Sequence, residues 1–577
     1  MSKNKPKWKK ILWGTLIVLM LVLIGEIIIL ALDSRTPSFK SPVRHISQLI
    51  PMDSSKVILF NNLQSETKDL LTHPLIKRFE KLKMTRDLLE SNDSKKWFDG
   101  IKAFEKYSGL KVDLDMVFRF FGEEGAIVKI QKDILVIAKV DRLTLFLKQA
   151  AKTLAKYKIL KKDIITKSYQ NIAIEQLTLG KQKLYFTFIG TYAFTSNNDK
   201  HLKNIIQLAH GKHYSAISAK QAFQKAMYQK AGKKYPIMIY EKVSHSVKSG
   251  EKGKSRQLSR LFKEEYWKIA LERKVIKIDY QYYYSKSGRS HPLSQILAKK
   301  SQKNQLLKSF PKATAFYLTS NRMNFEKLYG WLLKTWPRDN SERKAFQSTL
   351  RKIENVYKIQ IQKLISKYFD GEVALVLTGI GYQGFNPFPK VAFIVKTNRK
   401  ARPIRQMTKI FHYVFNHPKL KRRSLQGVKV FSFDSTRRFG YNNHQKNTTS
   451  KMRDFSPGFA YYKGYLIVTF SRNTLDAIIA YFKGASGLAK DKDHKGLWAQ
   501  VTRNYPIKYY VKPDRIKELA TTYIKYLYNN KPDDFYHHDA KVRLTPLINL
   551  LGEVRAIGGG VDFLKDQAVG EILIQLK

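Results

Sequence analysis

Segments of one pattern recur in the same order along both halves of this 577-residue chain. Residues 51–60 and residues 311–319 each begin with a proline and continue into a strand-like apolar run. Later in each half, a strand, a polar turn and an amphipathic helix that ends at glycine occupy residues 190–211 and residues 463–484. Such self-similarity predicts a duplicated module. The matched positions lie 273 residues apart: Tyr192, Leu202, Ile205, Ile206 and Gly211 recur as Tyr465, Leu475, Ile478, Ile479 and Gly484.

The strands inside each copy predict the fold class. Residues 124–128 are matched by residues 372–376, and the following strand at residues 134–139 is matched by residues 391–396. Short loops between neighbouring strands favour antiparallel hairpins, and a helical pattern follows each pair. We expect an α+β fold, with an N-terminal transmembrane helix followed by two tandem homologous modules of mainly antiparallel sheet with packed helices. The expected boundaries are a linker at residues 33–47, repeat module 1 at residues 48–286, a linker at residues 287–308 and repeat module 2 at residues 309–577.

One apolar run near the N-terminus is long enough to cross a membrane. As a helix, residues 11–32 would span about 33 Å, which exceeds the thickness of a bilayer core. A lysine-rich segment precedes this run and Asp33 follows it, so we expect residues 1–10 to form a cytoplasmic basic tail. We favour an uncleaved signal anchor over a cleaved signal peptide, because no small-x-small cleavage site precedes Asp33. The expected location is the bacterial inner membrane, with a single span and the bulk of the chain in the periplasm.

Charge and cysteine content limit the possible functions. The formal net charge is +60, and the chain contains no cysteine. Without cysteine there are no disulfides, thiolate nucleophiles, cysteine metal sites or acylated lipoprotein cysteine. The charge favours anionic partners such as nucleic acid, anionic lipid or an acidic envelope polymer. Because basic residues recur throughout the chain rather than in one stripe, a general lysine bias on solvated faces is the competing explanation.

Several short segments resemble a known bacterial family. Residues 69–72 (Asp-Leu-Leu-Thr) and residues 74–75 (Pro-Leu), the Glu-x-Ala-aliphatic-Val strands and the tyrosine-containing strand before Leu202 resemble the YfaA-like family of membrane-anchored proteins. That family is a domain of unknown function, so the resemblance implies no catalytic residue. It implies an envelope protein partner, because genes of the family often accompany alpha-2-macroglobulin-like envelope proteins.

Two glycine-containing segments resemble nucleotide-binding loops. Gly379, Gly381 and Gly384 form a G-x-G-x-x-G pattern directly after a strand. Pro387 and Pro389 disfavour the helix that a dinucleotide site needs, so we expect a glycine-rich hairpin loop instead. Residues 250–255 resemble the end of a P-loop but lack its first glycine, and we expect no nucleotide cofactor. The longer polar insertion at residues 440–458 predicts a mobile hairpin tip.

Acidic residues leave two further possibilities open. A cluster in the C-terminal part could bind a divalent metal or form a polar loop. Glu124 and Glu372, at equivalent strand positions, could be paired active carboxylates, or could accept hydrogen bonds from backbone donors or face solvent. The members of the C-terminal cluster are Asp533, Asp534, His537, His538 and Asp539.

The sequence thus predicts a binding or scaffolding protein of the bacterial envelope, anchored by a single span, without intrinsic catalysis. We assign no catalytic, cofactor-binding or metal-ligating residue, and expect no cofactor. Residues 11–32 would contact the membrane, and the expected partner is an envelope protein. The first alternative is an electrostatic binder of polyanions, namely anionic lipid, envelope polymer or nucleic acid. The second is a hydrolase that uses acidic residues such as Glu124, Glu372 or Asp534.

Overall fold

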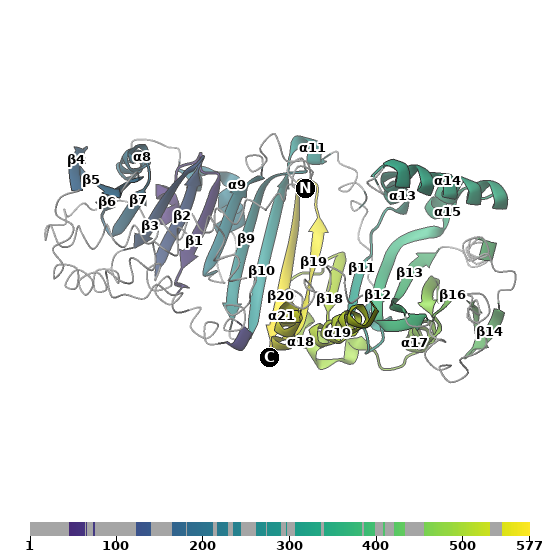
Figure 1. The fold of residues 1–577 in the computed structure, drawn as a ribbon. Helices are drawn as coiled ribbons and strands as arrows, with labels where there is room; N and C mark the ends of the chain where they lie inside the picture. Colours follow the sequence, from purple (N-terminus) through teal and green to yellow (C-terminus); the bar gives the residue numbers. More distant parts are fainter. Residues whose placement is uncertain are drawn as a thin grey trace. The chain divides into compact units, whose positions relative to one another are not determined.

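Antiparallel strands dominate the part of the chain that the structure describes (Figure 1). The computed structural model describes residues 45–63, 123–139, 164–179, 182–211, 216–228, 235–243, 261–289, 306–335, 340–383, 386–397, 421–432, 455–530 and 545–577, apart from position 273, together with a few short pieces outside these ranges. The chain divides into two compact units, unit 1 at residues 1–282 and unit 2 at residues 283–577.

Unit 1 is built on a sheet with the strand order β10-β9-β8-β1-β2-β3-β7-β6-β5-β4. Tight turns join several sequential strands. Between β4 and β5, for example, Gln170 and Asn171 have φ values of 49° and 63°, as a type I′ hairpin turn requires. The strands are β1 (Lys56–Asn61), β2 (Glu124–Ile130), β3 (Asp133–Lys139), β4 (Ile164–Tyr169), β5 (Ile172–Leu179), β6 (Gln182–Ile189), β7 (Tyr192–Ser196), β8 (Ile237–Lys242), β9 (Phe262–Glu272) and β10 (Val275–Tyr284).

Unit 2 repeats this order with its own strands, as β20-β19-β18-β11-β12-β13-β17-β16-β15-β14. Lys463 and Gly464, with φ values of 47° and 85°, form the turn between β16 and β17. Each strand of unit 2 therefore has a counterpart at the same place in the sheet of unit 1. The strands are β11 (Phe316–Ser320), β12 (Phe369–Gln383), β13 (Asn386–Thr397), β14 (Lys421–Leu425), β15 (Val428–Ser432), β16 (Phe455–Tyr462), β17 (Tyr465–Ser471), β18 (Ile507–Val511), β19 (Val554–Phe563) and β20 (Gln567–Leu576).

Amphipathic helices pack against both sheets. After β7, α8 begins at its N-cap Asn198, and α17 begins in the same way after β17 at its N-cap Ser471. The helical segments of unit 1 are η1 (Ile46–Leu49), α8 (Asp199–Ala209), η2 (Ile217–Ala219) and α9 (Gln221–Tyr228). Those of unit 2 are α11 (Lys286–Arg289), η4 (Leu306–Ser309), α13 (Phe325–Thr335), α14 (Asn340–Tyr357), α15 (Ile361–Tyr368), α17 (Arg472–Phe482), η8 (Leu488–Lys490), α18 (Lys492–Gln500), α19 (Pro513–Asn530), α21 (Thr545–Leu550) and η10 (Leu551–Glu553).

The predicted fold class, α+β modules behind a transmembrane helix, is wrong. The described residues contain twenty strands of antiparallel sheet and comparatively few helices. One reason is that β4 to β6 and β14 to β16 form further hairpins, for which the sequence pattern predicted no strands. Among the described residues, no helix is both long and apolar enough to span a membrane. Residues 11–32 lie outside the described residues.

Smaller predictions have separate outcomes. The strand, turn and helix expected at residues 190–211 and 463–484 are confirmed as β7 with α8 and β17 with α17. The expected module boundaries and the basic tail at residues 1–10 stay predictions. Most of the insertion at residues 440–458 lies outside the described residues, and its last part belongs to β16.

Candidate binding face

One face of the sheet in unit 2 carries two adjoining rows of apolar side chains. Each row crosses neighbouring strands through register pairs, and the two rows lie two residues apart along the strands, which places them on the same face. We call these side chains the apolar track. It comprises Tyr509, Leu318, Leu375, Phe393 and Val468 in the first row, and Ile557, Val511, Phe316, Leu377, Val391 and Phe470 in the second.

No side chain of the apolar track is buried. Leu318, Leu375, Phe393 and Phe470 are 40%, 39%, 39% and 45% exposed, and the remaining members are half-buried. A single exposed apolar side chain is ordinary on a protein surface, but a contiguous apolar patch marks an interaction site. The exposure of neighbouring strands in register therefore makes this face a candidate binding site.

Helices close the same face immediately beside the apolar track. On the side of the first row that faces away from the second row, the next side chains on this face are two residues from Leu375, Phe393 and Val468. They are Val373 of β12, Val395 of β13 and Leu466 of β17. They form a buried cluster with Phe325 of α13, and Ile365 of α15 packs against it. The helices α13 and α15 thus cover the part of this face that adjoins the apolar track.

The second row of the track is not required by the fold. In unit 1 four of the six equivalent positions carry ionisable side chains, and the Lys56 ammonium donates to Glu241 Oε2 at 2.7 Å. Burial raises the pKa of Glu265 to about 7, and the negative charge of Glu241 adds to this effect. Because the same strand positions accept charges in unit 1, strand pairing alone does not explain the apolar row. Lys56, Lys129, Glu241 and Glu265 of unit 1 correspond to Phe316, Leu377, Val511 and Ile557 of unit 2.

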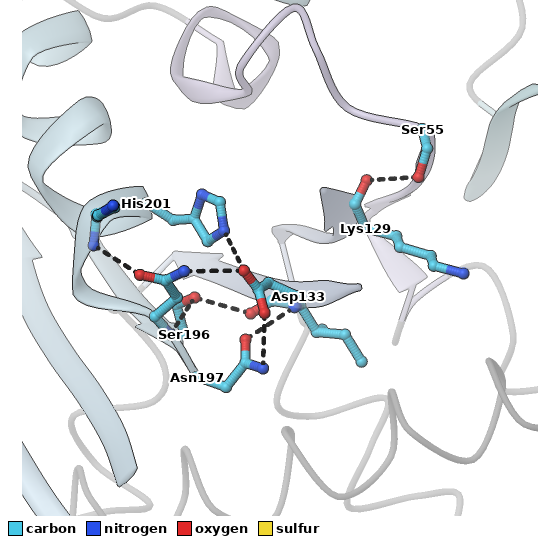
Figure 2. A network of polar contacts seen from close by, with 9 residues as sticks. Ser55, Lys129, Asp133, Ser196, Asn197 and His201 are labelled. Atoms are coloured by element: carbon cyan, nitrogen blue, oxygen red, sulfur yellow. Dashed lines mark hydrogen bonds and ion pairs between the residues drawn. The ribbon is translucent and has the colours of Figure 1, made fainter. Parts of the chain in front are cut away.

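At the end of this row, unit 1 has a polar network where unit 2 has Phe470 (Figure 2). Asp133 of β3 accepts hydrogen bonds from Asn197 Nδ2 at 3.2 Å and Asn198 Nδ2 at 2.9 Å, and it lies 3.0 Å from His201 Nε2. Burial alone would raise the pKa of Asp133, but the bonds from Asn198 and His201 together lower it. Since these bonds tie the turn before β3 to the start of α8, we interpret the network as structural. In unit 2, Phe470 occupies the position that is equivalent to Asn197.

At two central positions the first row differs between the units in exposure rather than in chemistry. Ile127 and Val136 of unit 1 are 8% and 1% exposed, whereas their counterparts Leu375 and Phe393 are each 39% exposed. The residues are apolar in both units, so the sheets present similar surfaces at these positions. The surface is thus covered at Ile127 and Val136 in unit 1 and open at Leu375 and Phe393 in unit 2.

Aromatic side chains extend the track beyond Phe470. The ring of Phe455 stacks on Phe470 with centroids 6.4 Å apart, and it meets Phe388 edge-on at 5.1 Å. A Cβ at Gly381 would lie 2.7 Å from Cε1 of Phe388, so the glycine makes room for this ring. The expected hairpin is confirmed, because β12 pairs directly with β13, but Gly379 and Gly381 are strand residues and do not form its loop. Gly384 lies outside the described residues.

The two equivalent glutamates accept the same hydrogen bonds in the two units. The Tyr192 hydroxyl donates to Glu124 Oε2 at 2.6 Å, and the N–H of Ile46 donates to Oε1 at 3.0 Å. In unit 2, the Tyr465 hydroxyl donates to Glu372 Oε2 at 2.7 Å, and the N–H of Leu306 in η4 donates to Oε1 at 3.1 Å. Each carboxylate thus anchors a short 3-10 helix to the sheet. This geometry favours the expected role as an acceptor of backbone donors over catalysis.

The other sequence candidates lie outside the described residues. These are the acidic and histidine cluster at residues 533–539 and the P-loop-like segment at residues 250–255. Within the described part of the chain, no group of three or more histidine or acidic side chains is placed to hold a metal ion. The apolar track was not predicted from the sequence. A position-by-position comparison of the two copies would have revealed its second row, because Phe316 and Leu377 stand where the first copy has Lys56 and Lys129.

Comparisons with known proteins add a family match. No curated protein matches the chain. Two solved structures of the protein TP0453 were found, in crystal forms III and IV, with 8% and 9% identity and TM-scores of 0.23 and 0.22. The alignments cover 46% and 40% of this chain and 91% and 80% of the TP0453 chains. The family model described as "Protein of unknown function (DUF3352)" matches residues 128–411, so a DUF3352 domain of unknown function spans these residues.

Proposed function

We propose that this protein is a non-catalytic binding protein of the bacterial envelope, and that its apolar track holds an amphipathic helix of an acidic partner protein. The observation that carries the proposal is the set of contiguous apolar side chains in register, four of which are about 40% exposed. The envelope location follows from the expected anchor at residues 11–32 and from the resemblance to the YfaA-like family.

The dimensions of the apolar track support a helix as the occupant. The track crosses six strands, from β19 to β17, and five strand spacings of about 4.8 Å give about 24 Å. A helix of about 16 residues has this length. Two rows about 7 Å apart offer an apolar strip that one face of such a helix would fill.

The chemistry of the surroundings supports the same occupant. The helices α13 and α15 already cover the adjoining part of this face, so a further helix would continue a packing arrangement that the protein uses. The net charge of +60 favours a helix whose solvent-facing side is acidic, because complementary charge accelerates association and disfavours cationic competitors. An amphipathic helix lying in an apolar groove or on an apolar face is a common mode of recognition.

Hydrolysis by acidic residues, the second alternative, lacks comparable support. The carboxylates of Glu124 and Glu372 are both engaged by a tyrosine hydroxyl and a backbone N–H. Asp534 lies outside the described residues. The first alternative, binding of polyanions, is supported by a separate surface of unit 2 that cationic side chains line.

A peptide-binding experiment tests the proposal directly. The probe is a fluorescent 16-residue helix with leucine along one face and glutamate elsewhere, and the control peptide has the same composition with leucine on all faces. Each fluorescence-anisotropy titration uses the full chain in detergent. Burial of the exposed part of one such side chain contributes about 1 kcal/mol to the binding free energy. Loss of three contributions in L318Q/L375Q/F393Q should therefore weaken binding about a hundredfold.

The matched control changes three exposed apolar side chains outside the track. Val356, Tyr523 and Leu564 are 62%, 49% and 41% exposed, and V356Q/Y523Q/L564Q should bind the probe like the unmodified protein. Equal binding of the two peptides, or an equal loss in the two triple variants, would refute the proposal. Track-dependent binding of neutral lipid vesicles without peptide binding would also refute it and would point to a membrane surface instead.

A further inference from the structure

A second surface of unit 2 has a different chemistry. The turn between α14 and α15 forms an open hollow of about 670 Å³. Four cationic side chains line it: Lys358, Lys363, Lys367 and Arg405, all of them exposed. Lys358 has φ 53° at the turn itself, between the end of α14 and the start of α15. This arrangement places four positive charges around one concave surface.

The acidic side chain in the hollow is already engaged. Glu354 lies in α14, and its Oε1 accepts the N–H of Ile361 at 2.8 Å. The carboxylate thereby caps the first turn of α15. It offsets one of the four cations, so the charged side chains that line the hollow sum to +3. A lining of this charge attracts an anion.

A lysine offsets the negative end of α14, which lies beside the hollow. The carbonyl groups at a helix C-terminus carry partial negative charge, which opposes anion binding. Here the Lys409 ammonium donates to the carbonyl oxygen of Tyr357 at 3.2 Å, and the cation reduces this opposition. The hollow has an apolar floor as well, because Ile359, Leu364 and Tyr368 are 5%, 9% and 5% exposed and line it.

We propose that this hollow binds a phosphate group. Phosphate oxygens accept several charge-assisted hydrogen bonds at once, and Lys and Arg together supply a point charge and a planar fork of donors. A phosphodiester brings an apolar or sugar substituent that would rest on the floor of the hollow. The group could come from free phosphate or from a phospholipid headgroup. The proposal does not depend on the apolar track.

The experiment measures saturable binding to the full chain in a zwitterionic detergent by isothermal titration calorimetry. One arm uses inorganic phosphate, and the other uses short-chain dihexanoyl phosphatidylglycerol below its micelle concentration. The test variant is K363Q/K367Q. The control variant is K344Q/K352Q, which removes the same charge from exposed positions of α14 outside the lining of the hollow.

We expect K363Q/K367Q to raise the dissociation constant about tenfold or more, and K344Q/K352Q to change it less than about twofold. Loss in both arms supports a site for the phosphate group itself, whereas loss in the lipid arm alone identifies a headgroup as the source. Equal losses in the two variants would show that only the general positive field acts, and this would overturn the proposal. Absence of saturable binding in both arms would overturn it as well.

Discussion

His494 of α18 should make the stability of unit 2 depend on pH. Its ring is 6% exposed, and Nε2 accepts the N–H of the Trp498 ring at 3.0 Å and lies 3.0 Å from the Tyr317 hydroxyl. Burial lowers the pKa of His494 to about 4; the charge of Asp491 opposes this shift, while Lys512 adds to it. The ring is therefore neutral in the folded protein at neutral pH.

The sign and size of the effect follow from proton linkage. An unfolded histidine has a pKa of about 6.5, so between about pH 6.5 and pH 4 the unfolded state binds the proton and the folded state does not. Protonation then favours unfolding, and stability falls as the pH falls. A difference of about 2.5 pKa units corresponds to about 3 kcal/mol, which should be lost by about pH 4.

The substitution His494→Phe removes the titration and keeps an aromatic ring. Phe223 of unit 1 occupies the equivalent position, where it meets Tyr240 edge-on at 5.7 Å, as His494 meets Tyr510 at 5.0 Å. The variant leaves Trp498 and Tyr317 without this acceptor, which costs about 1 to 3 kcal/mol at every pH.

The assay is urea unfolding of both proteins from pH 7.5 to pH 4, followed by circular dichroism. At pH 7.5 the H494F variant should be less stable than the unmodified protein. As the pH falls, the difference should shift by about 3 kcal/mol in favour of H494F, because only the unmodified protein loses stability through this group. A difference that stays constant with pH would refute the reasoning.

Three further predictions concern other buried groups. Tyr465→Phe removes a donor to Glu372, which is 1% exposed, and should lower the free energy of unfolding by about 1 to 3 kcal/mol; an unchanged urea midpoint would contradict the anchoring role. Gly559→Ala should destabilise strongly, because its Cβ would meet the carbonyl oxygen of Glu571, whereas Gly330→Ala, with nothing within 4 Å, should leave the melting temperature unchanged or raised. The pKa of Glu265 is raised by burial, so folded Glu265 holds its proton up to about pH 7 and the unmodified protein loses stability as the pH rises from about 4.5. Glu265→Gln should therefore become more stable relative to the unmodified protein as the pH rises over this range, and an advantage of the variant that grows as the pH falls would contradict the shift.

The sequence revealed the local elements better than the class of the fold. The recurrence of Tyr192 as Tyr465 correctly located a strand followed by a capped helix, since cap residues and apolar periodicity are local signals. The hairpins β4 to β6 and β14 to β16 were missed because short, polar strands such as residues 421–425 have no clear alternation of apolar residues.

For the candidate sites, too, the sequence revealed local features but not those that depend on the whole fold. The equivalence of Glu124 and Glu372 was visible in the sequence, but their tyrosine donors come from a different strand, and only the fold brings them together. The apolar track could not be recognised from single segments, because an apolar residue in a strand is normally buried. Exposure is a property of the whole face, and it depends on which elements pack against it.

Cysteine labelling tests the central claim most directly, namely that the sheet face is open at Leu375 and Phe393 of unit 2, where the equivalent Ile127 and Val136 of unit 1 are buried. The natural chain contains no cysteine, so Leu375→Cys and Ile127→Cys each place a single thiol in an otherwise unreactive protein. Leu375 is 39% exposed and Ile127 is 8% exposed, so the full-length L375C variant should react with a maleimide much faster than the I127C variant. Equal protection of the two thiols in the folded protein would show that the apolar track is covered, and it would contradict the account.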